Sequence, residues 1–349
     1  MAEPPLSREA LAALAAELAA LPGLRGKADI RPAAAALPHH PFPGLGPAAA
    51  LGDDAALLPG VGGPLLLAAE GLAPALVADD PWFAGWCGVL VNLSDIAAMG
   101  GRPLALVDSL WSPDHAHAQQ VLAGLRSAAD RFGVPLVGGH SNLNSPYAAL
   151  SVAVLGMAPG PVLSARSARP GDRCVLLVNR QGAFHRHYPF WDGATGADAA
   201  SLRRHLALLP ELAATGAVHA AKDISMGGLA GTAVMFAEAA GCALELDLER
   251  IEPPPGVPLA RWLACFPSTG FLLATQPGRL DQLLAQLAGQ SELHAAMIGR
   301  FSPGGGVSLA SGGSRARLWH PGTHLTGFGA TGSGDGSSDG SSDGSSDGA

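Results

Sequence analysis

The chain has 349 residues, of which 48% are hydrophobic and 14% charged, and its formal net charge at pH 7 is -8. This length is sufficient for two hydrophobic cores. The acidic balance argues against a nucleic-acid partner, which would require a basic face. The scattered cysteines, Cys87, Cys174, Cys242 and Cys265, give no disulfide or zinc signal. Without a long apolar run or a basic N-terminal segment, the sequence predicts a cytoplasmic protein with neither a membrane span nor a signal peptide.

The first half of the chain is predicted to mix helices and strands. Residues 7–21 have the pattern of an amphipathic helix, which Ser7 can cap and Pro22 can end. Residues 22–50 are rich in proline and glycine and are expected to be irregular. Strand patterns lie at 65–69, 104–110 and 148–157, and helical patterns begin at Trp82 and span 114–132.

The second half repeats this mixture after a break at residues 159–161, which is a plausible domain boundary. Strands are predicted at 174–179, 243–248, 271–275 and 295–301, the last of them ending the ordered pattern, and helices at 198–213, 227–240 and 279–287. Strands and helices alternate in both halves, so the sequence predicts an α+β (mixed α/β) fold.

Five regions follow from these patterns. The two domains are expected at 45–160 and 161–305. An N-terminal helix and flexible arm occupy 1–44, and a C-terminal extension occupies 306–331. The Gly/Ser/Asp repeat at 332–349 has almost no apolar residue, so it is expected to be disordered.

Short acidic motifs in the first third carry most of the functional signal. Asp53 and Asp54 stand in a Gly-Asp-Asp-Ala-Ala run, Glu70 follows a predicted strand, and Asp95 belongs to the run from Asn92 to Pro103. Clustered carboxylates beside small residues suit a magnesium ion that carries a polyphosphate, because magnesium prefers oxygen ligands. Each motif alone is also typical of an ordinary turn or helix cap.

In this order the motifs resemble the ATP-binding domain of the aminoimidazole ribonucleotide synthetase (PurM-like) superfamily. The run from Asn92 to Pro103 is most similar to thiamine-monophosphate kinase, whereas Asp79-Asp80-Pro81 and the helix after it are similar to selenophosphate synthetase. The resemblance covers residues 45–305. It implies a two-domain PurM-like fold, an N-terminal ATP-binding domain with a C-terminal α/β domain, and a homodimer that pairs through the N-terminal sheets.

The resemblance also assigns roles to individual residues. Asp53, Asp54, Glu70 and Asp95 are the expected magnesium ligands. The expected nucleotide-binding residues are Asn92, Gly138, Gly139, Gly227 and Gly228. The glycines allow close backbone approach, and Gly227 and Gly228 precede a helix whose free amides can bind an anion. Asp223, in a run that resembles a second-domain motif of the superfamily, and His140 are the expected catalytic residues.

Several positions depart from the kinase pattern. Glu70 replaces the second residue of a Thr-Asp pair, His140 replaces an aspartate, and Met226 replaces the second aspartate of the Asp223 motif. Histidine is a poor magnesium ligand, so His140 suits phosphate binding, proton transfer or a buried structural role. The first cysteine is Cys87, so the reactive N-terminal cysteine of selenophosphate synthetase is absent.

The sequence therefore favours an enzyme that uses ATP and Mg2+ to transfer a phosphoryl group to an oxygen of a small-molecule acceptor. The alternative is a degenerate nucleotide- or metabolite-binding subunit without catalysis of its own, which Met226 and His140 motivate. Two further features stay open. Lys27 either reaches phosphate oxygens or is a solvated lysine, and the aromatic and histidine-rich residues 184–191 either line a pocket or form a lid or surface loop.

Overall fold

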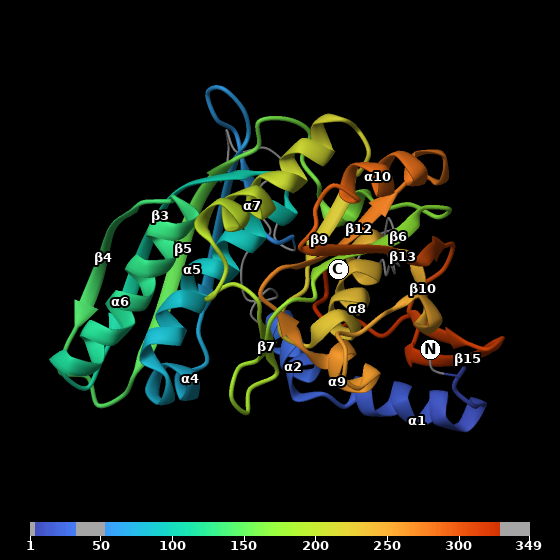
Figure 1. Ribbon diagram of the computed structural model, residues 1–349, viewed down its shortest axis with the longest axis horizontal. Helices are drawn as coiled ribbons and strands as arrows, with labels where there is room; N and C mark the ends of the chain where they lie inside the picture. Colours follow the sequence, from blue (N-terminus) through green and yellow to red (C-terminus); the bar gives the residue numbers. More distant parts are fainter. Residues whose placement is uncertain (1–3, 33–52, 329–349) are drawn as a thin grey trace, which may run out of the picture.

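The computed structural model describes residues 4–32 and 53–328, which form two units that each contain a β-sheet (Figure 1). The predicted tail at 332–349 and most of the predicted arm lie outside these residues. In the part of the chain that is described, no helix is long and apolar enough to cross a membrane.

The N-terminal unit is a five-stranded sheet covered by helices on one face. Its strand order is β1-β2-β5-β3-β4, and only the β3–β4 pair is parallel. The strands are β1 (Ala56–Leu58), β2 (Leu65–Gly71), β3 (Arg102–Trp111), β4 (Leu136–Asn142) and β5 (Ala149–Met157). The helices are α4 (Pro74–Asp79), α5 (Pro81–Ala98) and α6 (His115–Phe132), and the last two lie against each other over the sheet (Figure 1).

Two glycines allow α5 and α6 to pack closely. A Cβ atom on Gly85 would lie 2.1 Å from the carbonyl oxygen of Val121, and one on Gly124 would lie 2.0 Å from that of Trp82. Both contacts are impossible for a larger residue without a shift of the backbone. The separation of the two helices is therefore set by glycine at the crossing.

The C-terminal unit is a seven-stranded sheet with helices on both faces. Its strand order is β15-β14-β10-β13-β6-β12-β9. The strands are β6 (Arg173–Asn179), β9 (Ala220–Asp223), β10 (Ala243–Asp247), β12 (Gly270–Thr275), β13 (Leu293–Ser302), β14 (Val307–Ser311) and β15 (Ser314–Trp319). The helices are α7 (Ala199–Ala214), α8 (Gly228–Ala240), α9 (Leu259–Ala264) and α10 (Leu280–Leu287).

Strand β6 shows how the sheet separates two cores. Leu176 and Val178 join the core beneath α8 and α9, whereas Val175 and Leu177 join the core beneath α7 and α10. Successive side chains of a strand point to opposite faces, so a strand buried on both sides is apolar along its whole length. This pattern explains the continuous apolar run of β6.

The N-terminal helix belongs to the C-terminal unit. Helix α1 (Arg8–Ala19) is capped by Ser7, whose side chain accepts a hydrogen bond from the backbone N–H of Ala10 at 3.2 Å. Leu11 and Leu18 are buried in the same core as Leu318 of β15, and Figure 1 shows α1 beside that strand. Hydrophobic contact thus joins the first helix to the last strand.

Two expectations about element positions are wrong. Residues 22–29 are not irregular, because α2 (Pro22–Gly26) and a 3-10 turn (Lys27–Asp29) follow α1, with the short helix fixed by the fully buried Leu24. The strand predicted at 295–301 is not the last, because β14 and β15 follow it from the stretch expected to be an extension. The other predicted strands and helices are confirmed, with ends that differ by one or two residues.

A third, small sheet lies where the two units meet. It has the order β11-β8-β7 and consists of β7 (Ala183–Phe184), β8 (Phe190–Asp192) and β11 (Phe266–Pro267). The β7–β8 hairpin contains the aromatic and histidine-rich residues noted in the sequence. It is anchored to the N-terminal unit by His185, whose Nε2 lies 2.8 Å from a carboxylate oxygen of Asp80.

Candidate functional site

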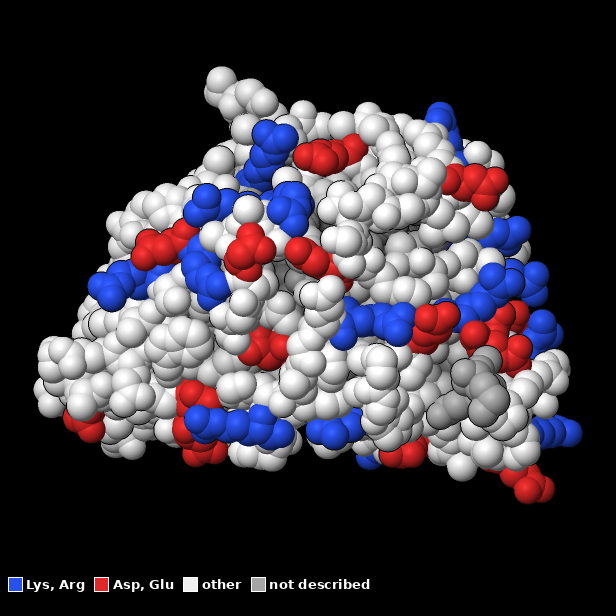
Figure 2. Space-filling model, in the orientation of Figure 1, with Lys and Arg blue, Asp and Glu red and all other residues white. Residues whose placement is uncertain are grey.

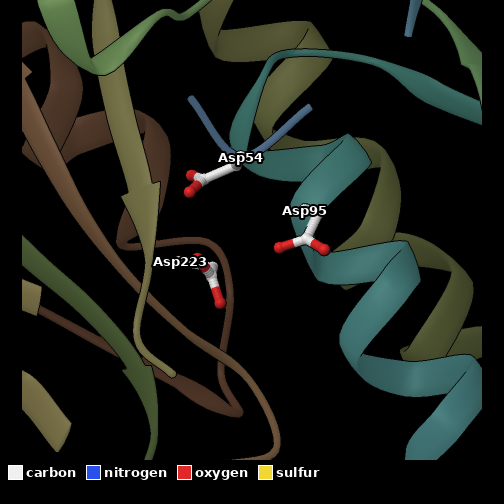
Figure 3. A group of neighbouring side chains, drawn as sticks. All are labelled: Asp54, Asp95 and Asp223. Atoms are coloured by element: carbon white, nitrogen blue, oxygen red, sulfur yellow. The ribbon is translucent and has the colours of Figure 1, made fainter. Parts of the chain in front are cut away.

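Three carboxylates from distant parts of the chain meet between the two units. Asp54 lies just before β1, Asp95 on α5 and Asp223 at the end of β9, and Figure 3 shows their side chains around a common space. One carboxylate oxygen of each lies within 4.8 Å of the others. Asp95 and Asp223 are buried, at 7% and 4% exposure. Two predicted metal ligands and one predicted catalytic residue are thus brought together.

Asp53 and Asp54 are held in different ways. The hydroxyl of Ser164 donates to Asp53, and the backbone N–H of Ala165 donates to the same carboxylate at 3.3 Å. Asp54 forms an ion pair with Lys222 of β9. Its other oxygen, Oδ2, is buried and has no hydrogen-bond partner among the described residues. The hydrogen bonds of Asp53 therefore link it to Ser164 and Ala165, at the start of the second unit. Asp54 instead has one carboxylate oxygen in the cluster that can still accept a hydrogen bond or bind a cation.

Burial and mutual repulsion raise the proton affinity of the cluster. Loss of solvation, followed by the charge of Asp223, raises the pKa of Asp95 well above its ordinary value. Burial, followed by the charge of Asp54, raises the pKa of Asp223 from 3.8 to about 7. Burial alone would lower the pKa of Lys222, but the carboxylates of Asp54 and Asp223 outweigh it and raise that pKa.

The pKa values of Glu70 and Asp53 are also raised, and burial is the main cause of both shifts. Glu70 leaves part of its surface open to solvent, yet surrounding protein removes enough water to raise the pKa of its carboxyl group. Burial and the charge of Asp54 raise the pKa of Asp53, although the Ser164 hydroxyl opposes the shift. Five carboxylates thus face two lysines, Lys27 and Lys222, around one cleft. An excess of buried negative charge is expensive without a compensating cation.

The donor set fits a divalent cation. The closely spaced oxygens of Asp54, Asp95 and Asp223 are hard ligands of the kind that magnesium prefers. The unpartnered Oδ2 of Asp54 and the raised pKa of Asp95 are independent signs that a positive charge is missing from this arrangement. Glu70 lines the same cleft.

Two cavities meet at the cluster. The polar cleft, about 640 Å³ including its open mouth, is lined by Lys27, Asp53, Asp54, Lys222 and neighbouring residues. The aromatic pocket, about 870 Å³ including its open mouth, is lined mainly by apolar and aromatic side chains. The two cavities share five lining residues, Lys27, Glu70, Asp95, Asp223 and Ser225. The acidic cluster is therefore accessible from two chemically different sides.

Asn92 and the predicted anion-binding glycines lie close to the cluster in sequence but do not line either cavity. The Asn92 side chain is fully buried within α5 and donates to the carbonyl oxygen of Gly88 at 2.8 Å. Gly227 and Gly228 have φ angles of 99° and 65°, and they pack against Leu24 and Ala264. Backbone conformation and close packing explain these two glycines without a ligand.

Gly138, Gly139 and His140 are farther away. They lie on β4 at the edge of the five-stranded sheet, and His140 is exposed. Glu70 on β2 is three strands from β4, which corresponds to about 14 Å. The structure does not bring these three residues to the acidic cluster.

The most important residue missed from the sequence is Lys222. Its position directly before Asp223 could have indicated that Lys222 lies near the site, but nothing in the sequence indicates its ion pair with Asp54. Lys27, left open above, lies at the boundary of both cavities. On the face of the molecule in Figure 2, acidic and basic side chains are interspersed rather than gathered by sign.

Comparison with known proteins identifies the family of the chain. The family model described as AIR synthase related protein, N-terminal domain, matches residues 52–158, and that of the C-terminal domain matches residues 174–312. An uncharacterised protein of Synechocystis sp. is 47% identical over 287 residues, which cover 82% of this chain and 88% of the relative. The chain belongs to the AIR synthase related family.

Relatives with named activities are more distant. A selenide, water dikinase of Myxococcus xanthus is 33% identical over 59% of this chain and 62% of its own length. A thiamine-monophosphate kinase of Caulobacter vibrioides is 33% identical over 47% of this chain and 49% of its own length. The chain therefore spans less than two thirds of either enzyme.

Solved structures confirm the two-domain fold. T. maritima PurL complexed with ADP superposes with a TM-score of 0.63 at 18% identity, covering 77% of this chain and 45% of PurL. AaThiL complexed with AMPPCP and TMP superposes with a TM-score of 0.56 at 21% identity, covering 77% of this chain and 91% of AaThiL. The solved structures confirm the expected α+β class, and at this identity the likeness concerns the fold alone. The expected superfamily is confirmed by the two family models together with the relatives named above.

Proposed function

We propose that the protein is an ATP-dependent phosphotransferase that uses Mg2+ and transfers the γ-phosphoryl group to an oxygen of a small molecule. The observation that carries this proposal is the acidic cluster at the junction of a polar cleft and an aromatic pocket. Phosphoryl transfer requires aligned donor and acceptor together with neutralised phosphate charge, and little covalent chemistry from the protein. Relatives named as kinases in the same family support it.

The metal would be held by Asp54 and Asp95 of the cluster, whose third member, Asp223, stays free to act as proton acceptor. Glu70, which lines the same cleft, and Asp53, which already has Ser164 and Ala165 as hydrogen-bond donors, are further candidate ligands. When bound, Mg2+ neutralises phosphate charge and orients the oxygens of the nucleotide. The triphosphate would occupy the polar cleft, where Lys222 and Lys27 supply positive charge. The proposed setting is the cytoplasm.

The residues of the chain contribute charge and a proton acceptor. Lys27 lines both cavities, so its ammonium group is suited to contact the transferring phosphoryl group, whose equatorial oxygens carry negative charge. The bond between the γ-phosphorus and the ADP oxygen breaks as a bond to the acceptor oxygen forms. Where the acceptor is a hydroxyl, its proton passes to Asp223, whose side chain lines both cavities.

A homodimer is part of the proposal. The face of the five-stranded sheet that α5 and α6 leave uncovered carries large apolar side chains, which are 37–63% exposed: Leu67, Leu104, Val107, Val137 and Leu155. Exposed apolar patches of this kind mark interfaces between proteins. The roles predicted for Gly138, Gly139 and His140 stay predictions, because these residues lie away from the acidic cluster of their own chain.

Calorimetry tests the proposal directly. ATP is titrated into the protein with and without Mg2+, and release of ADP is then assayed in the same sample after addition of thiamine monophosphate. Asp95→Asn should abolish Mg2+-dependent ATP binding, because it removes a charge from the cluster. Asp108→Asn is the matched control, since Asp108 is equally buried, at 7%, but lies outside both cavities.

The outcomes separate the two functions that the sequence left open. Mg2+-dependent binding with ADP release supports the phosphotransferase. Binding without release for any acceptor would favour the binding subunit. Equal ATP affinity in Asp95→Asn and wild type would remove the metal cluster as the basis of nucleotide binding.

A further inference from the structure

A third hollow opens on the C-terminal unit, away from the acidic cluster. It is lined by His219, which directly precedes β9, whereas Asp223 is the last residue of that strand. About 10 Å of strand separates the two ends of β9, and the hollow shares no lining residue with the polar cleft or the aromatic pocket. A small ligand bound in this hollow is therefore out of contact with the acidic cluster.

The walls of the hollow come from two parts of the chain. Ser167 and Arg169 belong to the connection from β5 to β6, residues 158–172, whereas His219 and Gln276 lie in loops at the ends of β9 and β12. The connection also links the two units. A ligand that contacts both walls would therefore hold this connection against the C-terminal sheet.

Three polar side chains line the hollow without a protein partner. Among the described residues, none forms a hydrogen bond or ion pair with the Ser167 hydroxyl, the Arg169 guanidinium group or the side-chain amide of Gln276. Water satisfies such groups on any protein surface, so their lack of partners does not define a site by itself. Their convergence on one hollow offers several hydrogen-bond donors to a single ligand.

The fourth polar side chain, His219, is held in place by a buried carboxylate. The side chain of Asp172 is 6% exposed, and its Oδ2 lies 2.8 Å from Nε2 of His219. The same oxygen accepts a hydrogen bond from the backbone N–H of Arg169 at 2.7 Å. One buried group thus positions both the imidazole ring and the backbone of the arginine, as a pre-organised binding site requires.

The charge of the hollow matches a single carboxylate. Arg169 is the one charged side chain among the described residues of the lining, and its planar fork can bind both oxygens of a carboxylate. A phosphate monoester carries a charge of about -1.5 to -2 near pH 7, so part of that charge would meet no cation. The buried carboxylate of Asp172 behind His219 increases this repulsion.

The rest of the lining suits a short aliphatic body. Its apolar side chains carry no aromatic ring: Pro161, Val162, Ala213 and Val218. Water can enter about 260 Å³ of the hollow, and one water molecule needs about 10–15 Å³ of such space. A molecule several times the size of water therefore fits, with its acid group on Arg169 and its carbon chain against the apolar side.

We propose that this hollow is a binding site for a small aliphatic carboxylic acid. Arg169 binds the carboxylate, and Ser167, His219 and Gln276 bind the remaining polar atoms of the ligand. The site is separate from the acidic cluster, so its ligand is not the phosphoryl acceptor. The proposal goes beyond the proposed function and does not depend on it.

Calorimetry tests the site in metal-free buffer, after the protein has been passed over a chelating resin. No metal ion can then link a carboxylate to the acidic cluster. The probes are isovalerate and lactate, each compared with its uncharged amide, and isobutyl phosphate represents the phosphate esters. At least one carboxylate should bind about tenfold or more tightly than its amide, because only the carboxylate pairs with the guanidinium group.

Variants locate the binding. Arg169→Ala removes the proposed counter-charge, and Gln276→Glu adds a negative charge to the wall. Both residues are exposed, so neither change disturbs the core, and each should weaken the better carboxylate by about tenfold. Arg317→Ala is the matched control, because Arg317 is an exposed arginine on β15 outside the hollow. Thermal unfolding of each variant confirms that it is folded before it is titrated.

The outcomes decide both the ligand class and the place. A preference for carboxylate that both variants of the hollow weaken supports the proposal. Equal affinity for carboxylate and amide, tighter binding of isobutyl phosphate, or no binding of either carboxylate overturns the ligand class. Carboxylate binding that survives Arg169→Ala or Gln276→Glu unchanged, or that Arg317→Ala weakens as strongly, overturns the assignment to the hollow. These titrations contain neither nucleotide nor Mg2+, so their failure leaves the proposed function standing.

Discussion

The neutral substitution Asp223→Asn should stabilise the metal-free protein. Asp223 is 4% exposed and shares a confined space with Asp54 and Asp95. Asparagine has nearly the same shape as aspartate but carries no charge, so it removes repulsion and desolvation cost together. The substitution would also remove the proposed proton acceptor, so we expect the gain in stability to be accompanied by a loss of activity.

The magnitude follows from the pKa of Asp223, which rises from 3.8 to about 7 in the folded protein. A shift of this size corresponds to about 4 kcal/mol between the two protonation states. The folded state holds the proton more tightly than the unfolded state, so stability falls as pH rises from about 4 to about 7 and stays low above that. Relaxation of the cluster reduces the value, and we expect a gain of about 2–4 kcal/mol for Asp223→Asn at pH 8.

Thermal unfolding in EDTA at pH 5 and pH 8 measures this effect. Wild type should lose stability between the two values, and Asp223→Asn should lose less, with the remainder due to Asp95 and Glu70, whose pKa values are also raised. With Mg2+ at pH 8 the wild-type protein should regain stability and the variant should regain less. A variant that melts below wild type at pH 8 in EDTA would refute the reasoning about buried repulsion.

Two predictions concern packing. Gly124→Ala should destabilise the protein by about 1–3 kcal/mol in urea unfolding, because its Cβ would lie 2.0 Å from the carbonyl oxygen of Trp82. Gly160→Ala, where no atom lies within 4 Å of the added carbon, should be nearly neutral, and equal effects would contradict the proposed crossing. Leu18→Ala should cost about 2–5 kcal/mol, since Leu18 is 1% exposed, whereas Leu122→Ala, at 36% exposure, should cost much less. If Leu18→Ala cost as little stability as Leu122→Ala, the burial of α1 would contribute little to the stability of the protein.

Local signals in the sequence predicted most of the longer elements and the acidic residues. Asp54, Asp95 and Asp223 stand in short motifs, and the helix that carries Asp95 follows simple apolar periodicity, whereas the short strand β9 that ends at Asp223 is not among the predicted strands. These features depend on neighbouring residues in the chain. They could be read without knowledge of the pairing between distant segments.

Contacts between distant segments could not be read in this way. The ion pair of Lys222 with Asp54 joins residues 168 positions apart, and the pairing of Phe190 with Phe266 builds the aromatic pocket from two short strands. The paired glycines of β4 resemble a phosphate-binding turn in sequence, but strand order places them at the far edge of the sheet. Sequence motifs give the chemistry of a residue, whereas the sheet topology decides which residues share its space.

The position of α1 also constrains the order in which the chain acquires its structure during synthesis. The strands of the N-terminal unit lie between residues 56 and 157, so this unit can assemble before the rest of the chain has been made. Helix α1 is synthesised earlier still, but its core partner Leu318 lies near the other end of the chain. The leucine face of α1 can contact α2, α8 and α9 earlier, but its cover is complete only when β15 (Ser314–Trp319) has been synthesised. The contact between α1 and β15 closes a loop of nearly the whole chain, and long-range contacts of this kind are expected to slow folding.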